Sequence, residues 1–190
     1  MGTRRAGLVK QRQAPLRERY RSFPAEARIT DCAQTVNACG GDAFHGVVVP
    51  ANGADVPLCF GVHRAVGGFH DYPNPGDLLS AALAACFDST LRMIAEHLDI
   101  RLTMLEVGVE AECDVRGCLL VEPDVPVGFQ RMLCRVRLQA DDDVDDSKMQ
   151  TLVAAAERSC VVMQTLRHGV TVEALVERKT AVRADATTVG

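Results

Sequence analysis

Two cysteines, Cys86 and Cys160, are the residues of this sequence best suited to chemistry. Each lies in a run of small and apolar residues with helical periodicity, and a long stretch of chain separates them. A thiol buried in a helix is usually inert. Two such helices packed together could instead present a nucleophile beside a resolving partner, which requires a fold that brings both helices into contact.

The composition predicts one domain with an aliphatic core. The chain has 190 residues, 47% of them hydrophobic, but no Trp and only 4% aromatic residues, so Ala, Val and Leu must fill the interior. A formal net charge of −4 argues against a nucleic-acid-binding surface. No apolar stretch approaches the ~20 residues that a membrane span needs. Neither nucleic acid nor membrane is therefore an expected partner.

The number of cysteines and the residues at the N-terminus indicate the cellular compartment. Eight are present, and no apolar segment of signal-peptide type follows the basic N-terminus. Cysteines without a secretory signal favour a reducing cytoplasm. Their spacing contains no CxxC and gives no local zinc signature, so we expect no metal or cofactor. Most of the remaining cysteines are expected to be small buried apolar side chains.

The first third of the chain predicts an arm followed by a β-meander. Residues 1–15 are basic and polar without periodicity, which predicts a disordered start. A short helix at 16–20 would end before Pro24. Alternating apolar residues then predict three antiparallel strands. These strands span residues 27–36, 44–49 and 57–63, with turns at 40–42 and 52–53.

The first long helix is predicted from residue 75 to about residue 98. Asn74 and Pro75 suit the N-cap and the first helical position, and apolar residues recur at i+3 and i+4 spacing. Alanines on both sides of Cys86 remove side-chain bulk, so another helix could approach closely there. Residues 78–87 are apolar almost all round and must be covered on more than one side, which predicts a dimer.

The second long helix is predicted from a capping box at Ser147 and Gln150 to Gly169, with Cys160 in its interior. Further strands are predicted at 105–115, 132–140 and 170–176, with an acidic turn at 141–146. Two long helices on antiparallel sheet predict an α+β fold. The expected organisation is an N-terminal arm at 1–27, a single domain at 28–178 and a flexible tail at 179–190.

The motif around Cys86 resembles that of the OsmC/Ohr family, the osmotically inducible and organic-hydroperoxide-resistance proteins. The matching residues are Asn-Pro-x-Asp-Leu-Leu from Asn74, Ala-Ala-Leu-Ala-Ala-Cys-Phe ending at Phe87, and, after Cys160, Thr-Leu-Arg-x-Gly-Val from Thr165. The resemblance covers roughly residues 28–176. It implies an OsmC-like fold in which antiparallel sheets wrap around two central helices of an intertwined homodimer, with active sites at the subunit interface.

The resemblance also implies a reaction. Enzymes of the family reduce organic hydroperoxides with a peroxidatic and a resolving cysteine, and a dithiol, often protein-bound dihydrolipoamide, regenerates them. By this resemblance Cys86 is the peroxidatic thiol and Cys160 the resolving thiol. The chemistry needs both, because a thiolate that attacks a peroxide becomes a sulfenic acid, which a second thiol converts into a disulfide.

Activation of Cys86 is where the sequence departs from the family pattern. A free thiol is only about 3% ionised at pH 7, and Cys86 lies about 16 Å from the helix start, beyond the reach of the helix dipole. Family enzymes supply an Arg from the first β-hairpin, held by a Glu at the start of the cysteine helix. Here residues 40–45 contain no Arg, Gly76 takes the place of the Glu, and Asp77 could replace it. The candidates for the positive charge are Arg28, Arg64 and His45.

The predicted substrate site is an apolar pocket near Leu79, Leu83 and Phe87 that accepts an alkyl tail, with Arg64 steering an anionic substrate. Other functions stay open. The same fold could serve as a non-peroxidatic redox sensor, as a small-ligand-binding dimer, or as a purely structural dimer. Histidines 63 and 70 could bind a metal, although histidines in such a loop are far more often surface residues.

Overall fold

The chain folds around one long helix. The computed structural model describes residues 7–37, 41–51, 56–141 and 144–177. In chain order the elements are α1 (Leu8–Ser22), η1 (Pro24–Ala27), β1 (Cys32–Val36), β2 (His45–Ala51), β3 (Leu58–Gly61), η2 (Arg64–Val66), α2 (Pro75–His97), β4 (Leu102–Glu112), α3 (Val115–Cys118), β5 (Arg131–Ala140), α4 (Asp146–Ser159) and α5 (Val161–His168). The predicted α+β class with antiparallel sheets is confirmed.

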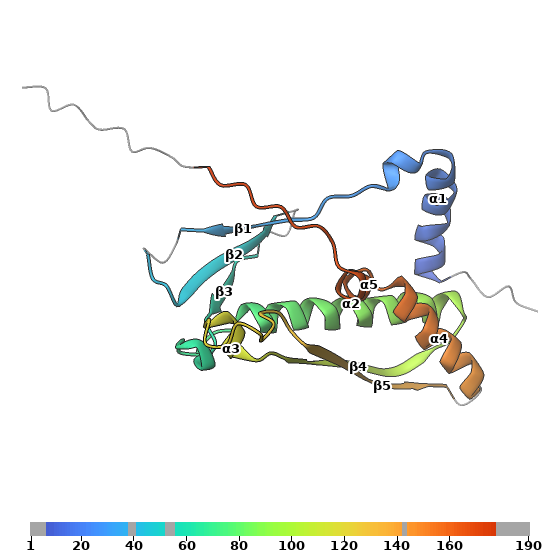
Figure 1. Ribbon diagram of the computed structural model, residues 1–190. Helices are drawn as coiled ribbons and strands as arrows, with labels where there is room; N and C mark the ends of the chain where they lie inside the picture. Colours follow the sequence, from blue (N-terminus) through green and yellow to red (C-terminus); the bar gives the residue numbers. More distant parts are fainter. Residues whose placement is uncertain (1–6, 38–40, 52–55, 142–143, 178–190) are drawn as a thin grey trace, which may run out of the picture.

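Helix α2 is the axis on which the other elements are arranged (Figure 1). The two-stranded sheet β4–β5 runs along one side of α2, and α4 and α5 pack against another side. Helix α1 contacts the C-terminal half of α2, away from the β4–β5 sheet. The three-stranded sheet β1–β2–β3 lies beyond the N-terminal end of α2.

Local capping defines both ends of α2. The Asn74 side chain accepts the N–H groups of Gly76 and Asp77, and Asp77 accepts the N–H of Asn74 in return, which completes a capping box. At the other end Asp99 has a positive φ of 55°, and the N–H of Ile100 reaches back to the carbonyl of Ala95 at 2.8 Å. This is the hydrogen bond of a Schellman ending. The predicted span of 75 to about 98 is confirmed.

The meander predicted at the start of the domain is also confirmed. Strand β1 pairs with β2 and β2 with β3, both antiparallel, with Val36 opposite Val47 and His45 opposite Gly61. The first strand begins later than predicted, at Cys32. Parts of the predicted turns, residues 40 and 52–53, lie outside the described residues.

The core lies between α2, the β4–β5 sheet, α4 and α5. Alternate side chains of β5 face inward, as its exposure pattern shows. Complete burial of an aliphatic side chain such as Leu91 or Leu152 contributes about 1.5–3 kcal/mol. The buried apolar residues are Leu83, Phe87, Leu91, Ala95, Ile100, Leu105, Leu152, Ala156, Cys160 and Met163.

Helix α1 corrects the prediction for the N-terminal arm. It begins at Leu8, so the expectation of a disordered start is wrong from that residue onward. The helix buries no residue. It is attached instead by polar contacts: Glu96 Oε1 accepts the N–H groups of Val9 at 2.6 Å and Lys10 at 3.1 Å, and Lys10 Nζ pairs with Asp99. A carboxylate from a distant helix therefore caps α1, which local sequence patterns could not reveal.

The second long helix is in fact two. Helices α4 and α5 meet at Cys160, and the cap of α4 is Asp145, whose side chain accepts the N–H of Lys148 at 2.7 Å. The predicted cap at Ser147 is therefore wrong by two residues, because an aspartate closer to the acidic turn takes that role. Gly169, with φ of 70°, ends α5 as predicted.

The strand predicted at 170–176 is not formed in this chain. Residues 169–177 leave α5 in an irregular conformation and extend away from α2 and the β4–β5 sheet (Figure 1). Val170, Val172, Leu175 and Val176 are 66–92% exposed. A strand exists only where a neighbour supplies backbone partners, and no described strand of this chain pairs with this segment.

Helix α2 also corrects the expectation that no apolar stretch of the chain approaches the length of a membrane span. It is long and apolar enough to cross a membrane, since an 18-residue window has a mean hydropathy of 1.4, with 28% of that window buried. Length and composition alone are weak evidence, because core helices of soluble proteins share them. Here α2 packs against β4, α4 and α5.

Candidate active site

Cys86 lies near the middle of α2 with a partly buried side chain. The hydroxyl groups of Ser89 and Thr90, one turn further on, both donate to the carbonyl oxygen of Cys86, at 3.0 and 2.7 Å. These bonds hold the backbone but leave the sulfur available. Among the described residues, the hydrogen-bond partner of the Cys86 sulfur is Cys160.

Cys160 is the single residue between α4 and α5, rather than part of a helix interior as predicted. Its φ of −74° and ψ of 110° break the helix, while its carbonyl already accepts the N–H of Gln164 at 2.9 Å. Its side chain is 0% exposed. Burial raises the pKa of the Cys160 thiol, the backbone N–H of Met163 opposes this effect, and the neighbouring Cys86 adds to it.

The structure brings the two predicted cysteines together. The Sγ atoms of Cys86 and Cys160 are 3.3 Å apart, although 74 residues separate them in the chain. Helix α2 packs against both α4 and α5, and Ala156, one turn before Cys160, is completely buried where these helices meet. A disulfide has an S–S distance of about 2.05 Å, so an approach of roughly 1.3 Å would close the pair.

A cavity of about 740 Å³ lies between α2, β5, α4 and α5. Leu83 and Phe87, two of the residues predicted to contact the substrate, line it, and Met163 near Cys160 lines it as well. Leu79, the third predicted residue, does not. The wall is polar as well as apolar, because Gln130, Arg131 and Arg167 also line the cavity, and Arg167 pairs with Glu157 at 3.0 Å. An elongated apolar molecule with a polar end would suit these walls.

Cys134 on β5 is a lining residue of this cavity that sequence reasoning left among the inert thiols. Burial raises the pKa of the Cys134 thiol, Arg167 opposes the shift and Glu157 adds to it. The sequence signal that could have found it is the alternation of β5, which turns Met132, Cys134 and Val136 to the same face of the sheet.

Asp77 serves α2 rather than a cation in this chain. Its carboxylate accepts the N–H of Asn74 at 2.9 Å and the side-chain amide of Asn74 at 2.6 Å. It sits in the first turn of α2, whereas Cys86 lies about 13 Å further along the axis. The structure therefore does not bring Asp77 beside the cysteine pair, and its role in activating a cation stays a prediction.

The predicted cations also lie away from Cys86. Arg64 is in η2, before the loop that leads to α2, and Arg28 is exposed between η1 and β1. His45 on β2 is bound on both ring nitrogens, by Asp42 at 2.6 Å and Asp71 at 3.1 Å, and these carboxylates raise its pKa. Among the described residues, no ion pair or hydrogen bond joins any of the three to Cys86.

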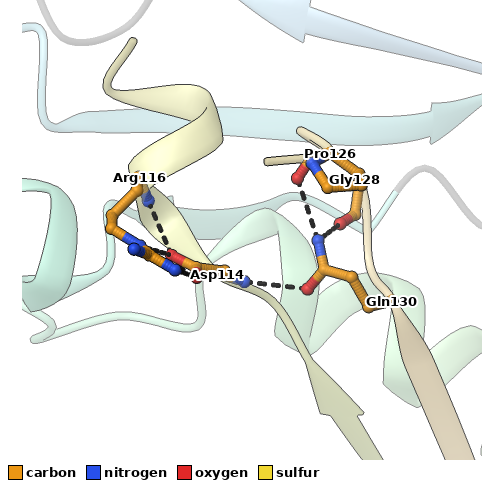
Figure 2. A network of polar contacts seen from close by, with 5 residues as sticks. All are labelled: Asp114, Arg116, Pro126, Gly128 and Gln130. Atoms are coloured by element: carbon orange, nitrogen blue, oxygen red, sulfur yellow. Dashed lines mark hydrogen bonds and ion pairs between the residues drawn. The ribbon is translucent and has the colours of Figure 1, made fainter. Parts of the chain in front are cut away.

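Gln130 secures the long connection between β4 and β5 (Figure 2). Its side-chain oxygen accepts the N–H of Asp114 at 2.9 Å, and its side-chain nitrogen donates to the carbonyls of Pro126 and Gly128 at 2.9 and 2.6 Å. The Arg116 side chain beside Asp114 lowers the pKa of that carboxyl to about 2. The connection is thus held by a compact polar network.

This connection covers a second cavity, of about 720 Å³, at the N-terminal end of α2. Its lining includes His63 and the free thiols of Cys113 and Cys118. The rings of His63 and His70 are in edge contact at 4.5 Å. The described residues contain no group of three or more His, Cys, Asp or Glu side chains arranged to hold a metal ion.

The family to which these elements belong follows from comparison with known proteins. The family model described as OsmC-like protein matches residues 68–174, more than half of the chain, from the loop before α2 to beyond α5. The chain belongs to the OsmC-like family. The resemblance stated from the motifs around Cys86 and Cys160 is therefore confirmed. No curated protein matches the sequence significantly.

Solved structures of OsmC-like proteins share this fold. The OsmC like protein of Mycoplasma pneumoniae has a TM-score of 0.59 at 12% identity, covering 74% of this chain and 89% of its own. The organic hydroperoxide resistance protein OsmC of Legionella pneumophila has a TM-score of 0.55 at 23% identity, covering 74% and 90%. An organic hydroperoxide resistance protein of Elizabethkingia anophelis has a TM-score of 0.55 at 22% identity, covering 75% and 91%. At these identities the likeness establishes a common fold.

Proposed function

We propose that this OsmC-like protein is a thiol-dependent reductase of organic hydroperoxides. The observation that carries the proposal is the 3.3 Å contact between the partly buried sulfur of Cys86 and the fully buried sulfur of Cys160. Membership of the OsmC-like family supports it, as does the shared fold with proteins named for organic hydroperoxide resistance.

The proposed reaction has two steps at the cysteine pair. The Cys86 thiolate attacks the distal oxygen of the hydroperoxide, the O–O bond breaks, and the alkoxide takes a proton and leaves as an alcohol, so that Cys86 becomes a sulfenic acid. Cys160 then attacks the Cys86 sulfur, an S–S bond replaces the S–O bond, and the hydroxide leaves as water with the Cys160 proton. The short distance between the two sulfurs favours this second step over further oxidation.

The alkyl part of the substrate is assigned to the 740 Å³ cavity. Leu83 and Phe87 line it and lie on the same helix as Cys86. The predicted contributions of Leu79 and Arg64 remain part of the proposal, with Leu79 one turn before Leu83 on α2. Replacing Leu83 with Asp should raise KM for cumene hydroperoxide more than for hydrogen peroxide, because the latter has no tail to bury.

A dithiol, such as a lipoylated protein, is the proposed reductant. Cys160 is 0% exposed and therefore cannot be reached, so the incoming thiolate must attack Cys86 and release Cys160. The second thiol of the reductant then releases Cys86 and closes its own disulfide. Such a cycle belongs in a compartment where thiols are kept reduced, which is why the proposal places the protein in the cytoplasm.

The second part of the proposal is a homodimer. Ala81, Ala82 and Ala85 leave one side of α2 exposed, and the apolar segment 169–177 has no strand partner among the described residues. A second copy could cover both, which is the arrangement expected from the family resemblance. Light scattering coupled to size-exclusion chromatography should give twice the chain mass; a monomer at micromolar concentration would contradict this part.

Disulfide mapping tests the reaction. Reduced protein is mixed with an equivalent amount of cumene hydroperoxide, free thiols are blocked, and disulfides are mapped by mass spectrometry. A Cys86–Cys160 bond should form rapidly, and Cys86→Ser should abolish turnover, whereas Cys32→Ser, at an exposed strand position, should not. Unchanged hydroperoxide reduction by the Cys86→Ser protein would refute the proposal.

The alternative function is a non-peroxidatic OsmC-like dimer that senses redox state or binds a small ligand. Two observations favour it: the second cavity of about 720 Å³, and the fact that no described cation forms a hydrogen bond or ion pair with Cys86. If hydroperoxide leaves all thiols free while the thiol oxidant diamide still links Cys86 to Cys160, the redox-sensor function would be preferred. If neither reagent links them, a ligand screen by thermal shift should follow.

A further inference from the structure

The Cys86 thiolate needs a neighbouring group that stabilises its negative charge. A free thiol is mostly protonated at neutral pH, and only the thiolate is nucleophilic. Helix dipole effects are confined to the first and last turns, and Cys86 is near the middle of α2. No described cation forms a hydrogen bond or ion pair with its sulfur, as shown above.

Two ion pairs lie on the elements around the cysteine pair, whereas Arg158 on α4 is exposed and has no ion-pair partner among the described residues. On α2, Arg92 pairs with Asp88 at 2.7 Å. Between α5 and α4, Arg167 pairs with Glu157 at 3.0 Å. On the side of α1, Arg17 contacts His97 at 3.2 Å, and burial lowers the pKa of His97. The inward face of β5 contributes the neutral thiol of Cys134, described above. The oppositely charged pairs Arg92–Asp88 and Arg167–Glu157 provide little net field at the sulfur, whereas Arg17 keeps its charge beside His97.

The position of the proton between the two sulfurs follows from their burial. Cys160 is completely enclosed by α2, α4 and α5, where an uncompensated charge is strongly disfavoured. Burial accordingly raises the pKa of the Cys160 thiol. Cys86 is only partly buried, so its thiolate keeps some access to solvent. The Cys160 thiol is therefore the donor of the 3.3 Å contact and the Cys86 sulfur the acceptor.

Resting on the proposed function, we propose that Cys160 acts before it resolves: its S–H donates a hydrogen bond to the Cys86 thiolate and so supplies stabilisation that no described cation of this chain provides by a hydrogen bond or ion pair. A hydrogen bond to a charged acceptor is about twice as strong as one between neutral groups. The same proton then leaves with the hydroxide when Cys160 attacks the Cys86 sulfenic acid. Cys160 is in this way both an activating donor and the resolving thiol.

The test compares Cys160→Ser, which keeps a donor, with Cys160→Ala, which removes it. The rate of alkylation of Cys86 by iodoacetamide is followed by mass spectrometry of its peptide across a range of pH. The alanine protein should be alkylated about tenfold more slowly at neutral pH than the serine protein, and its alkylation profile should shift to higher pH. Equal profiles for the two variants would overturn the proposal.

The wild-type protein provides a second measurement that depends on no variant. Alkylation of both peptides is followed in native reduced protein, and Cys86 should react at lower pH and at least about tenfold faster than Cys160. Preferential alkylation of Cys160 would refute the assigned direction of the hydrogen bond. Neither experiment uses a peroxide. If the serine and alanine proteins differ but the protein does not turn over hydroperoxide, this inference stands and the proposed function fails. If the protein turns over hydroperoxide but the two variants do not differ, the proposed function stands and this inference fails.

Discussion

Removing the carboxylate of Glu96 should make helix α1 open more often while leaving the core intact. Glu96 Oε1 accepts the N–H groups of Val9 and Lys10, two of the donors that have no partner within their own helix. Loss of a helix cap costs about 1 kcal/mol, and loss of a negative charge at a helix N-terminus costs about 0.3–1 kcal/mol. Glu96→Ala should therefore cost about 1.5 kcal/mol, and Glu96→Gln, which keeps an acceptor oxygen, about 0.5 kcal/mol.

This cost should appear in the opening of α1 and not in global unfolding. The helix buries no residue, and an isolated polar helix of its length is marginal in water. A loss of about 1.5 kcal/mol raises the opening constant roughly tenfold. Amide hydrogen exchange along Leu8–Ser22 measures that constant directly, and trypsin cleavage within the helix provides a second readout. The midpoint of urea unfolding should change little.

A matched control separates the cap from simple charge loss. Asp99 pairs with Lys10 at 2.6 Å, but its side chain is 63% exposed, so Asp99→Asn should raise exchange in α1 by no more than about twofold. Gly7→Ala should reproduce the Glu96→Ala effect, because a Cβ at residue 7 would collide with the Glu96 carboxylate. Unchanged exchange in Glu96→Ala, or an equal effect of Asp99→Asn, would refute the assigned role of Glu96.

Two further predictions concern other sites. Val161→Pro should stabilise the protein by about 0.4–1 kcal/mol, measured by urea unfolding. Position 161 is the first residue of α5, and Cys160 before it already has the extended φ and ψ that proline requires. A loss of stability would contradict this prediction. The carboxylates of Asp42 and Asp71 raise the pKa of His45 in the folded protein. The stability that His45 contributes is therefore complete below the ordinary histidine pKa of about 6.5, and it is lost as pH rises through the raised pKa. The difference in unfolding free energy between wild type and His45→Asn should therefore shrink as pH rises above about 6.5, and a constant difference would count against the double carboxylate contact.

Local sequence patterns were sufficient where the governing contacts are local. Asn74, Pro75 and Asp77 cap α2 with their own neighbours, so its start could be predicted from a few adjacent residues. Alternating side chains similarly predicted the meander. The motifs around Cys86 and Cys160 also identified the OsmC-like family, now shown by the family match.

Other predictions failed because the deciding contact is distant in the sequence. Helix α1 depends on Glu96, which lies more than eighty residues away. The strand predicted at 170–176 needs a neighbouring strand that the described residues of this chain do not supply. In each case local residue types suggested one structure, and a contact with a distant part of the chain, or its absence, decided which structure forms.

The cysteine pair likewise depends partly on local sequence and partly on tertiary packing. The sequence by itself determined which two thiols lie in small-residue segments able to pack closely, because residue size and periodicity are local properties. Only the tertiary structure decided that the chain breaks between α4 and α5 at Cys160 and that its sulfur lies 3.3 Å from Cys86. It also decided that Cys160 is fully enclosed and Cys86 is not. Burial and distance are properties of packed elements, and they determine which sulfur holds the proton and which is free to react.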